Sequence, residues 1–465
     1  MNRLQYFTAT LLAFTVMAHG AEVQQEPPKP AAPRPFQLPT PQTITLPNGI
    51  EATFIEFGVV PKVTIAITVR TGNLNEGDKV WLADLTGDLL KEGTQKRTAE
   101  QIADAATQMG GAVAIGVGAD ETSLAIDVLS EYGADAVALL SEILTQPKLP
   151  ATELARIRQD YLRNLSVQLT QPQAIAGAAM AELLYPSHPY GKSYPTPEQL
   201  SNYTIEDVRG YYDANFGAKR THVYVAGKFD RAAIEQAIRE DLGSWREGPE
   251  PLMLAPPEQQ PRTVKLIDRP GAPQSTLRIG TRVIGPTDPD FMPMSVTNSL
   301  LGGGLTSRIT MNLREKRGWA YSPNSSLSTY YHQGAWTENA DVKAANTGES
   351  IAEVLKEIEK LRSEPPKEAE LTAIKNYRNG VFVMQTATRG GLIGQLAFMN
   401  LQGLPPEWLT TFPERLNAVT PEQISQAAKA YLNPSKMSVV VVGDLASVTP
   451  QLQSVPGLPE AQIKK

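Results

Sequence analysis

Two aspartates stand four residues apart in the stretch Trp81–Thr94, which contains residue types that could do chemistry. Residues at positions i and i+4 of an α-helix lie on one face, so the carboxylates of Asp84 and Asp88 are expected to share a face. Two carboxylates alone make a poor zinc site and at best hold a harder ion loosely. The alternative is that both are ordinary helix carboxylates, solvated or close to the helix N-terminus.

The same stretch keeps the outline of a known active-site helix. It reads Trp-Leu-Ala-Asp-Leu-Thr-Gly-Asp-Leu-Leu-Lys-Glu-Gly-Thr, which resembles Gly-Leu-Ala-His-x-x-Glu-His-x-x-x-x-Gly-Thr of the pitrilysin/insulinase-type zinc metallopeptidases, the inverzincins, which include mitochondrial-processing-peptidase-like proteins. In that family the two His bind zinc and the Glu is the catalytic base. Asp84 and Asp88 occupy the His positions and Gly87 the Glu position. The resemblance implies a peptidase fold with a degenerate metal motif.

The third zinc ligand of that family, a Glu further along the chain, is also missing. The corresponding region is Tyr161–Leu165, and Arg163 or Asn164 stands where the Glu would be. A relocated zinc site is not favoured, because the chain has no His-x-x-x-His pair. The histidines beyond the N-terminal region are far apart in sequence: His188, His222 and His332. The sequence therefore predicts that this chain binds no zinc and does not hydrolyse peptides on its own.

A second group of candidate residues follows Asn298. The segments Asn298–Arg308 and Leu313–Tyr321 resemble the second half of the same family, which uses an Arg and a Tyr seven residues apart to contact the substrate backbone and the developing oxyanion. By position these are Arg314 and Tyr321. A guanidinium and a phenol can stabilise charge on a carbonyl oxygen without a metal. The alternatives are a surface ion pair for Arg314 and a packed aromatic for Tyr321.

A run of three glycines lies in the first of these segments. Glycine has no side chain, so a peptide or another backbone can approach it closely, and the resemblance makes this run part of the substrate-binding region. The alternative is a flexible turn. The three residues are Gly302, Gly303 and Gly304.

Composition excludes several function classes. The chain has 465 residues, a formal net charge of −6 and a pI of about 5.5, which indicates two or more domains and no nucleic-acid-binding surface. It has no cysteine, so disulfides, thiolate zinc ligands and a cysteine nucleophile are excluded. No phosphate-binding loop, dinucleotide fingerprint or Gly-x-Ser-x-Gly motif supports unrelated enzyme chemistry.

The N-terminus reads as an export signal followed by a leader. Arg3 precedes an apolar run, Phe7–Ala18, and small residues at Ala18 and Gly20 fit a cleavage site. The run is too short to span a membrane. Residues 1–20 are therefore predicted to be a signal peptide and residues 21–42 a Pro-rich disordered leader. A Cys-free exported chain fits the periplasm, and no membrane span is expected.

Internal repeats predict the architecture. The strand-like segments 63–70 and 275–282 share one alternating pattern, with Arg70 and Arg282 212 residues apart. Thr204 and Thr420 precede helices, and Gly227 and Gly443 end strands, both at an offset of 216 residues. Amphipathic helices are expected at 134–144 and 352–361. Two homologous domains follow, 43–245 and 262–446, with a linker at 246–261 and a tail at 447–465.

Each domain is expected to be α+β, with an antiparallel sheet and helices on one face. The family resemblance adds that the two domains enclose a chamber. Some bacterial members of the family divide the work between two chains, one with the zinc motif and one with the Arg/Tyr pair. The resemblance therefore implies a non-catalytic subunit whose partner is a homologue with an intact His-x-x-Glu-His motif and bound zinc, acting on an extended peptide. Self-association, and a pseudopeptidase that binds peptides or acts as a scaffold without proteolysis, are the alternatives.

Overall fold

The computed structural model describes residues 38–255, 258, 261–458 and 462–464, and Leu38–Lys465 form one compact unit. The predicted signal peptide and nearly all of the predicted leader lie outside the described residues. In the part of the chain that is described, no helix is both long and apolar enough to cross a membrane.

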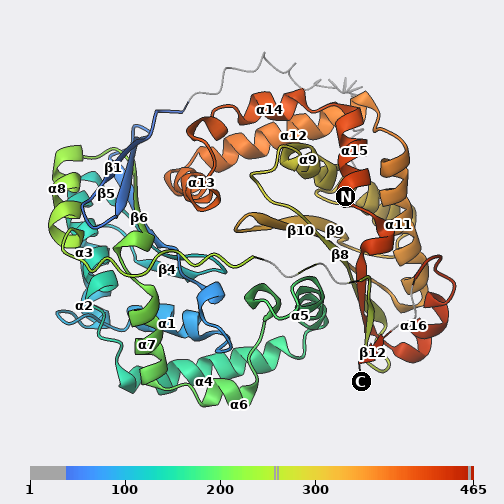
Figure 1. Ribbon diagram of the computed structural model, residues 1–465, viewed down its shortest axis with the longest axis horizontal. Coiled ribbons are helices and arrows are strands. Elements are labelled where there is room, and N and C mark those ends of the chain that lie inside the picture. The colour runs from blue at the N-terminus through green and yellow to red at the C-terminus, as the bar shows by residue number, and fades with distance from the viewer. Residues whose placement is uncertain (1–37, 256–257, 259–260, 459–461, 465) are drawn as a thin grey trace, which may run out of the picture. The chain divides into compact units, whose positions relative to one another are not determined.

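The first half of the unit contains one six-stranded sheet in the order β1-β2-β6-β3-β5-β4 (Figure 1). Its strands are β1 (Gln42–Thr45), β2 (Glu51–Glu56), β3 (Lys62–Val69), β4 (Ala114–Val117), β5 (Thr122–Leu129) and β6 (Thr221–Gly227). Its α-helices are α1 (Leu82–Leu90), α2 (Ala99–Gln108), α3 (Gly133–Thr145), α4 (Ala151–Gln168), α5 (Pro172–Leu184), α6 (Pro197–Ser201), α7 (Ile205–Asn215) and α8 (Arg231–Leu242). Short 3-10 turns are η1 (Asn73–Asn75), η2 (Ser130–Tyr132), η3 (Pro189–Gly191) and η4 (Ala218–Arg220).

The second half has a six-stranded sheet in the order β12-β7-β11-β8-β10-β9. Its strands are β7 (Val264–Asp268), β8 (Gln274–Ile284), β9 (Asn324–Tyr330), β10 (Gln333–Lys343), β11 (Ser438–Gly443) and β12 (Gln462–Lys464). Its α-helices are α9 (Phe291–Leu301), α10 (Arg308–Thr310), α11 (Thr347–Ser363), α12 (Glu368–Thr386), α13 (Arg389–Gln402), α14 (Phe412–Ala418), α15 (Pro421–Tyr431) and α16 (Leu445–Leu452). A π-helical turn, η5 (Met311–Lys316), follows α10, and η6 (Ala344–Asn346), η7 (Pro406–Trp408) and η8 (Pro434–Lys436) are 3-10 turns.

The two-sheet α+β fold and its internal repeat are confirmed. Thr204 and Thr420 cap equivalent helices, α7 and α15, and each hydroxyl accepts the N–H of the third helical residue. Most strand pairs are antiparallel, as expected. One pair at the same place in each sheet is parallel, β2 with β6 and β7 with β11, and β12 also pairs with β7 in parallel. The sequence did not predict these parallel pairs.

The outer face of the first sheet carries a large apolar core. Alternate β3 residues are apolar and almost fully buried, and they pack with helices such as α3 in one cluster. The members of β3 in that cluster are Val63, Ile65, Ile67 and Val69. The residues between them, Thr64, Ala66 and Thr68, are also buried, at 8%, 5% and 5% exposure. A second layer must therefore cover the opposite face.

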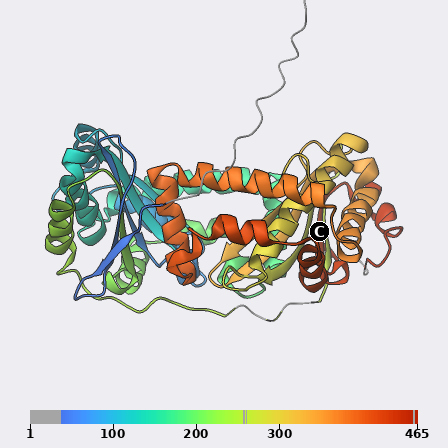
Figure 2. The same cartoon turned by 90° about the horizontal axis from the view of Figure 1, so that it is seen from above.

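That second layer comes from the other half of the chain. Helix α13 packs on β3 and β6 of the first sheet, and α5 packs on β8 and β11 of the second sheet. Figures 1 and 2 show α13, in orange-red, beside the blue strands of the first half. Arg389, at the start of α13, donates from Nη2 to Oδ1 of Asp127 on β5 at 2.8 Å. The sequence predicted helices on one face of each sheet, and this exchange adds one helix to the other face.

The exchanged helix α5 has a core of its own. Its small and apolar residues share a cluster with strands of the second half, because α5 is apolar around much of its circumference. The α5 members are Ala176, Ala179, Met180 and Leu184, and the strand members are Ala335, Val440 and Val442. Gly280 on β8 allows this approach, since a Cβ there would lie 2.9 Å from Sδ of Met180.

Candidate functional site

Helix α1 carries the degenerate motif, and its start is held by a buried carboxylate. Glu76 accepts the backbone N–H groups of Trp81 and Ala83, each at 3.0 Å. These donors belong to the first helical turn, where a negative charge is favourable. Trp81 itself has a φ of 70°, which is uncommon for a bulky residue. Burial raises the pKa of Glu76 to about 7. No sequence motif pointed to this role of Glu76.

Asp84 and Asp88 lie on α1 as predicted, and each is already engaged. Asn73 Nδ2 donates to Asp84 Oδ2 at 2.7 Å, and the Tyr161 hydroxyl donates to Asp88 Oδ2 at 2.7 Å. Lys91 Nζ forms an ion pair with Asp88 Oδ1, also at 2.7 Å. Burial, the largest cause, raises the pKa of Asp84 above its usual value.

Another residue of the Tyr161–Leu165 region contacts the degenerate motif. Tyr161 of α4, and not Arg163 or Asn164, reaches Asp88. The side chain of Arg163 is 70% exposed and pairs with Asp160 one turn earlier. Trp81 packs edge-on against Tyr161, with ring centroids 5.7 Å apart. The place of a third carboxylate is therefore taken by a phenol that is packed and hydrogen-bonded.

This set of side chains does not fit zinc. Two carboxylates, an amide and a neutral phenol replace the imidazoles that zinc sites use, and the Lys91 ammonium competes for one carboxylate. Within the described residues, no three His, Cys, Asp or Glu side chains are grouped closely enough to hold a metal ion. No catalytic step through a metal is derived for this chain.

Gly87, which stands at the position of the family's catalytic Glu, has no room for a side chain. It is buried in the middle of α1, and a Cβ there would lie 2.5 Å from Cγ2 of Val117 on β4. We expect Gly87→Ala to lower the free energy of unfolding by ~1–3 kcal/mol through overpacking, although alanine favours helix by about 1 kcal/mol. Urea denaturation is the measurement.

Two further variants test the cause. Gly87→Ala combined with Val117→Ala should recover most of the lost stability, because the clashing methyl is gone. Gly210→Ala in α7, where a Cβ would meet nothing within 4 Å, should leave stability unchanged or raise it. Equal effects of Gly87→Ala and Gly210→Ala would contradict the overpacking account.

The Arg314 and Tyr321 side chains lie in contact with each other. Arg314 lies on the π-helical turn η5, and its Cζ is 5.2 Å from the centroid of the Tyr321 ring. Tyr321 is 80% exposed and the Arg314 side chain 33% exposed, so both face solvent. Arg314 Nε also lies 3.2 Å from Glu315 Oε1. π-Helical turns inside helices are frequent at functional sites.

The three glycines of the run differ in how closely other atoms approach them. A Cβ at Gly302 would lie 2.5 Å from the backbone N of Ser325, and a Cβ at Gly303 would lie 2.7 Å from Cα of Ser299. Close packing within the protein therefore requires these two glycines. A Cβ at Gly304 would meet nothing within 4 Å. Gly304 is thus the member of the run with open space in front of it.

The two groups of predicted residues are not joined by contacts. Among the described residues, no hydrogen bond, ion pair or ring contact connects Arg314 or Tyr321 with Asp84 or Asp88. Each group is therefore a separate local arrangement.

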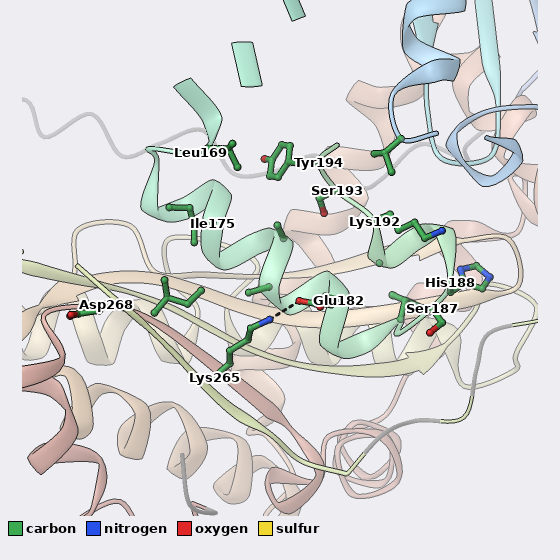
Figure 3. A pocket seen from close by; sticks show the side chains of 16 residues that line it. Leu169, Ile175, Glu182, Ser187, His188, Lys192, Ser193, Tyr194, Lys265 and Asp268 are labelled. Atoms are coloured by element: carbon green, nitrogen blue, oxygen red, sulfur yellow. Dashed lines mark hydrogen bonds and ion pairs between the residues drawn. The ribbon is translucent and has the colours of Figure 1, made fainter. Parts of the chain in front are cut away.

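A cavity of about 590 Å³ lies beside the start of α1. Its walls combine α5, the loop before and after η3, and β7. Figure 3 shows Lys265 of β7 directed at Glu182 of α5, and their Nζ and Oε2 atoms are 2.6 Å apart. His188 also lines the cavity, and burial, the largest cause, lowers its pKa.

Aromatic packing connects this cavity to the degenerate motif. Val80 and Tyr194 line the cavity, and the ring of Tyr194 packs edge-on against Trp81 at 5.7 Å between centroids. The cavity size falls in the range of ligand pockets. The cavity therefore adjoins the start of α1, which carries the degenerate motif.

Comparisons with known proteins agree with the motif. Residues 58–198 match the profile described as "Insulinase (Peptidase family M16)", and residues 202–377 match "Peptidase M16 inactive domain". The chain belongs to the insulinase, or M16, family of peptidases. Aspartates stand at the family's zinc-ligand histidine positions, so this chain is a member with a degenerate metal motif.

Relatives in the M16 family are distant but cover most of the chain. An uncharacterized zinc protease of Mycobacterium leprae is 25% identical over 417 residues, 87% of this chain and 92% of its own. One from Bacillus subtilis is 23% identical over 390 residues, 83% of this chain and 94% of its own.

Solved structures show the same fold. The M16 inactive domain from Pseudomonas fluorescens has a TM-score of 0.81 at 24% identity, covering 87% of this chain and 98% of that one. The periplasmic protease PqqL from Escherichia coli has a TM-score of 0.75 at 17% identity and covers 95% of this chain and 48% of that one.

Proposed function

We propose that this M16-family chain is a non-catalytic subunit of a periplasmic zinc peptidase. The observation that carries the proposal is the contrast between its two groups of residues. The metal positions carry aspartates that are engaged by Asn73, Tyr161 and Lys91 in place of the family's histidines, whereas Arg314 and Tyr321 are stacked, partly and largely exposed, and in the family's order. A partner homologue with an intact His-x-x-Glu-His motif supplies the zinc.

In this proposal the chain contributes donors to a reaction centred on its partner. The Arg314 guanidinium and the Tyr321 hydroxyl are donors that would hold the peptide backbone and stabilise negative charge on its carbonyl oxygen, while a zinc ion held by the partner would supply the activated water. The resemblance of the fold to the periplasmic protease PqqL from Escherichia coli, and the export signal expected in residues 1–20, support a periplasmic location.

The test begins with the partner. Tagged chain is captured from the periplasm of its native cell, and the bound chains are identified by mass spectrometry. A near-stoichiometric homologue with His-x-x-Glu-His supports the proposal. Recovery of this chain alone, or with unrelated envelope proteins, leaves the alternative, a pseudopeptidase that binds peptides or serves as a scaffold.

Substitutions then test the donors. In the reconstituted pair we expect Arg314→Ala and Tyr321→Phe each to lower kcat tenfold or more without preventing assembly, since loss of one oxyanion donor costs about 10²–10³ in kcat in well-studied cases. Turnover of a short peptide and co-elution on size exclusion are the measurements.

Arg317→Ala is the matched control. Arg317 follows η5, packs over the Trp319 ring at 4.4 Å and pairs with Glu353. Like Arg314 it is an arginine next to an aromatic ring, but no contact with substrate is predicted for it. Its removal should leave kcat unchanged. Full turnover by the Arg314→Ala, Tyr321→Phe double variant would sink the proposed role.

A further inference from the structure

A second cavity, of about 700 Å³, lies between the first sheet and α13. The inner face of β2 and β6 forms one wall, and α13 with the segment through η7 forms the opposite wall. Figure 1 shows α13 facing this side of the first sheet. Neither the degenerate motif nor the Arg314–Tyr321 pair lines this cavity.

The sheet wall carries a chain of polar side chains. His222 of β6 lies between two residues of β2, with Nε2 2.7 Å from Thr53 Oγ1 and Nδ1 3.2 Å from Glu51 Oε2. Thr43 Oγ1 lies 2.8 Å from Thr53 Oγ1. The parallel pairing of β2 with β6, which places Glu51 opposite His222, produces this alignment. The Tyr224 ring stacks on His222 at 4.2 Å between centroids.

The Glu51 carboxylate carries a charge. The contact with His222, the largest cause, lowers the pKa of Glu51, so Glu51 is ionised at neutral pH. Nε2 of His222 is hydrogen-bonded to Thr53 Oγ1, whereas its Nδ1, 3.2 Å from Glu51 Oε2, has no hydrogen-bond partner among the described residues. His222 and Thr53 are 7% and 5% exposed, so both side chains are buried.

The Glu51 carboxylate remains available to a ligand. The Glu51 side chain is 45% exposed, and its Oε1 has no hydrogen-bond partner among the described residues. Glu407, exposed on η7, also lines the cavity. The described lining includes no lysine or arginine. The cavity therefore has a negative end with no cation of its own.

The opposite wall is apolar along part of α13. Leu392 and Leu396 of α13 are buried at 0% and 8% exposure, and Met399 at 7%. Leu409 on the same wall and Ile55 of β2 on the sheet wall are also apolar and buried, whereas Asn400 and Glu407 are polar members of the opposite wall. A site of this volume with apolar walls and a few convergent polar groups is typical of a small-molecule pocket.

We propose that this cavity binds a small amphiphilic cation, with its ammonium at Glu51 and its aliphatic body against Leu396 and Met399. Burial of the aliphatic part supplies the main driving force, and the carboxylate selects the charge. His222 Nδ1 and Asn400 Nδ2 lie 3.2 and 3.5 Å from Oε2 of Glu51, which leaves Oε1 for the ligand. The site does not depend on proteolysis by a partner.

The first experiment is calorimetric titration of the full chain with n-octylammonium, at a concentration below micelle formation, with octanoate and octanol as comparison ligands. We expect one octylammonium site and at least tenfold weaker binding of the other two. Higher salt should weaken binding, because the contact at Glu51 is partly exposed to solvent.

Variants locate the site. Glu51→Gln should weaken octylammonium binding at least tenfold, whereas Glu56→Gln, an exposed glutamate at the end of the same strand, should leave it unchanged. Hydrogen–deuterium exchange keeps the test valid if a variant is unstable: octylammonium should slow exchange of β2 and α13 in the unaltered chain, and not of α5. Equal binding of octanoate, or no protection at β2 and α13, would overturn the proposal.

Discussion

Residues 43–245, produced without the second half, are expected not to form a cooperatively folded domain. In the intact chain, α5 buries its apolar surface against β8 and β11 of the second half. Ala176 and Met180 are 0% and 2% exposed there and would face water in the fragment. The fragment would also lose α13, which covers the inner face of its own sheet. Circular dichroism during thermal unfolding, and dye binding to exposed apolar surface, are the measurements.

A cut chain is the matched control. A protease site placed after Met253 in the linker allows the folded protein to be nicked, which removes chain connectivity and keeps every packed contact. The nicked protein should melt cooperatively and its pieces should stay together. Co-production of the two halves should likewise recover a complex. A sharp melting transition of the isolated 43–245 fragment, with α5 protected from hydrogen exchange, would contradict the expectation.

Glu338→Leu should raise the melting temperature by several degrees. Glu338 of β10 is 1% exposed, and neither of its carboxylate oxygens has a hydrogen-bond partner. It pairs with Ile279 of β8, and at the equivalent place in the first half Leu124 pairs with Ile67. A buried carboxyl without partners is costly, and leucine at the same place in the repeat is well packed.

The pH dependence of this effect has a definite sign. Burial raises the pKa of Glu338 well above its ordinary value of 4.5. Below pH 4.5 the side chain is protonated in the folded and unfolded chain alike, and ionisation costs nothing. As pH rises above that value, the unfolded chain releases its proton and the folded chain keeps it, so stability falls by about 1.4 kcal/mol per pH unit up to the raised folded pKa.

The stability gained by Glu338→Leu should therefore increase between pH 5 and pH 8, a range that includes the roughly neutral conditions in which proteins are most stable. Glu338→Gln removes the titrating carboxyl but keeps a polar side chain. It should therefore make stability less dependent on pH, with a smaller rise in melting temperature than Glu338→Leu. Glu56→Gln, on an exposed strand position, should change neither. A gain that is the same at every pH would show that ionisation of Glu338 does not contribute.

Strong local patterns made much of the fold predictable. The alternating segment 63–70 became β3, at Lys62–Val69, and the amphipathic segment 134–144 became α3, at Gly133–Thr145. Thr204 and Thr420 were recognisable because hydroxyl caps act within one turn of the helix they start. Such signals depend on neighbours in sequence, so a single chain contains them.

Tertiary partners were not predictable in the same way. Helix α5 is apolar on more than one side, so its sequence indicates burial without saying which surface it covers. The spacing of Asp84 and Asp88 placed both on α1, but their partners Asn73 and Tyr161 come from other elements. For Tyr161 a weak signal existed, a polar aromatic in the region of the missing ligand. For Glu76 no local pattern was present.

The exchange of α5 and α13 has a consequence for the origin of the chain. A protein with a single copy of the repeat would leave one face of its sheet bare and one helix without a surface to cover. Two such copies satisfy both needs by swapping helices, which gives a symmetric dimer. Fusing the copies makes each half a permanent support for the other. A half whose metal motif is degenerate is then still required, because its helix completes the neighbouring sheet.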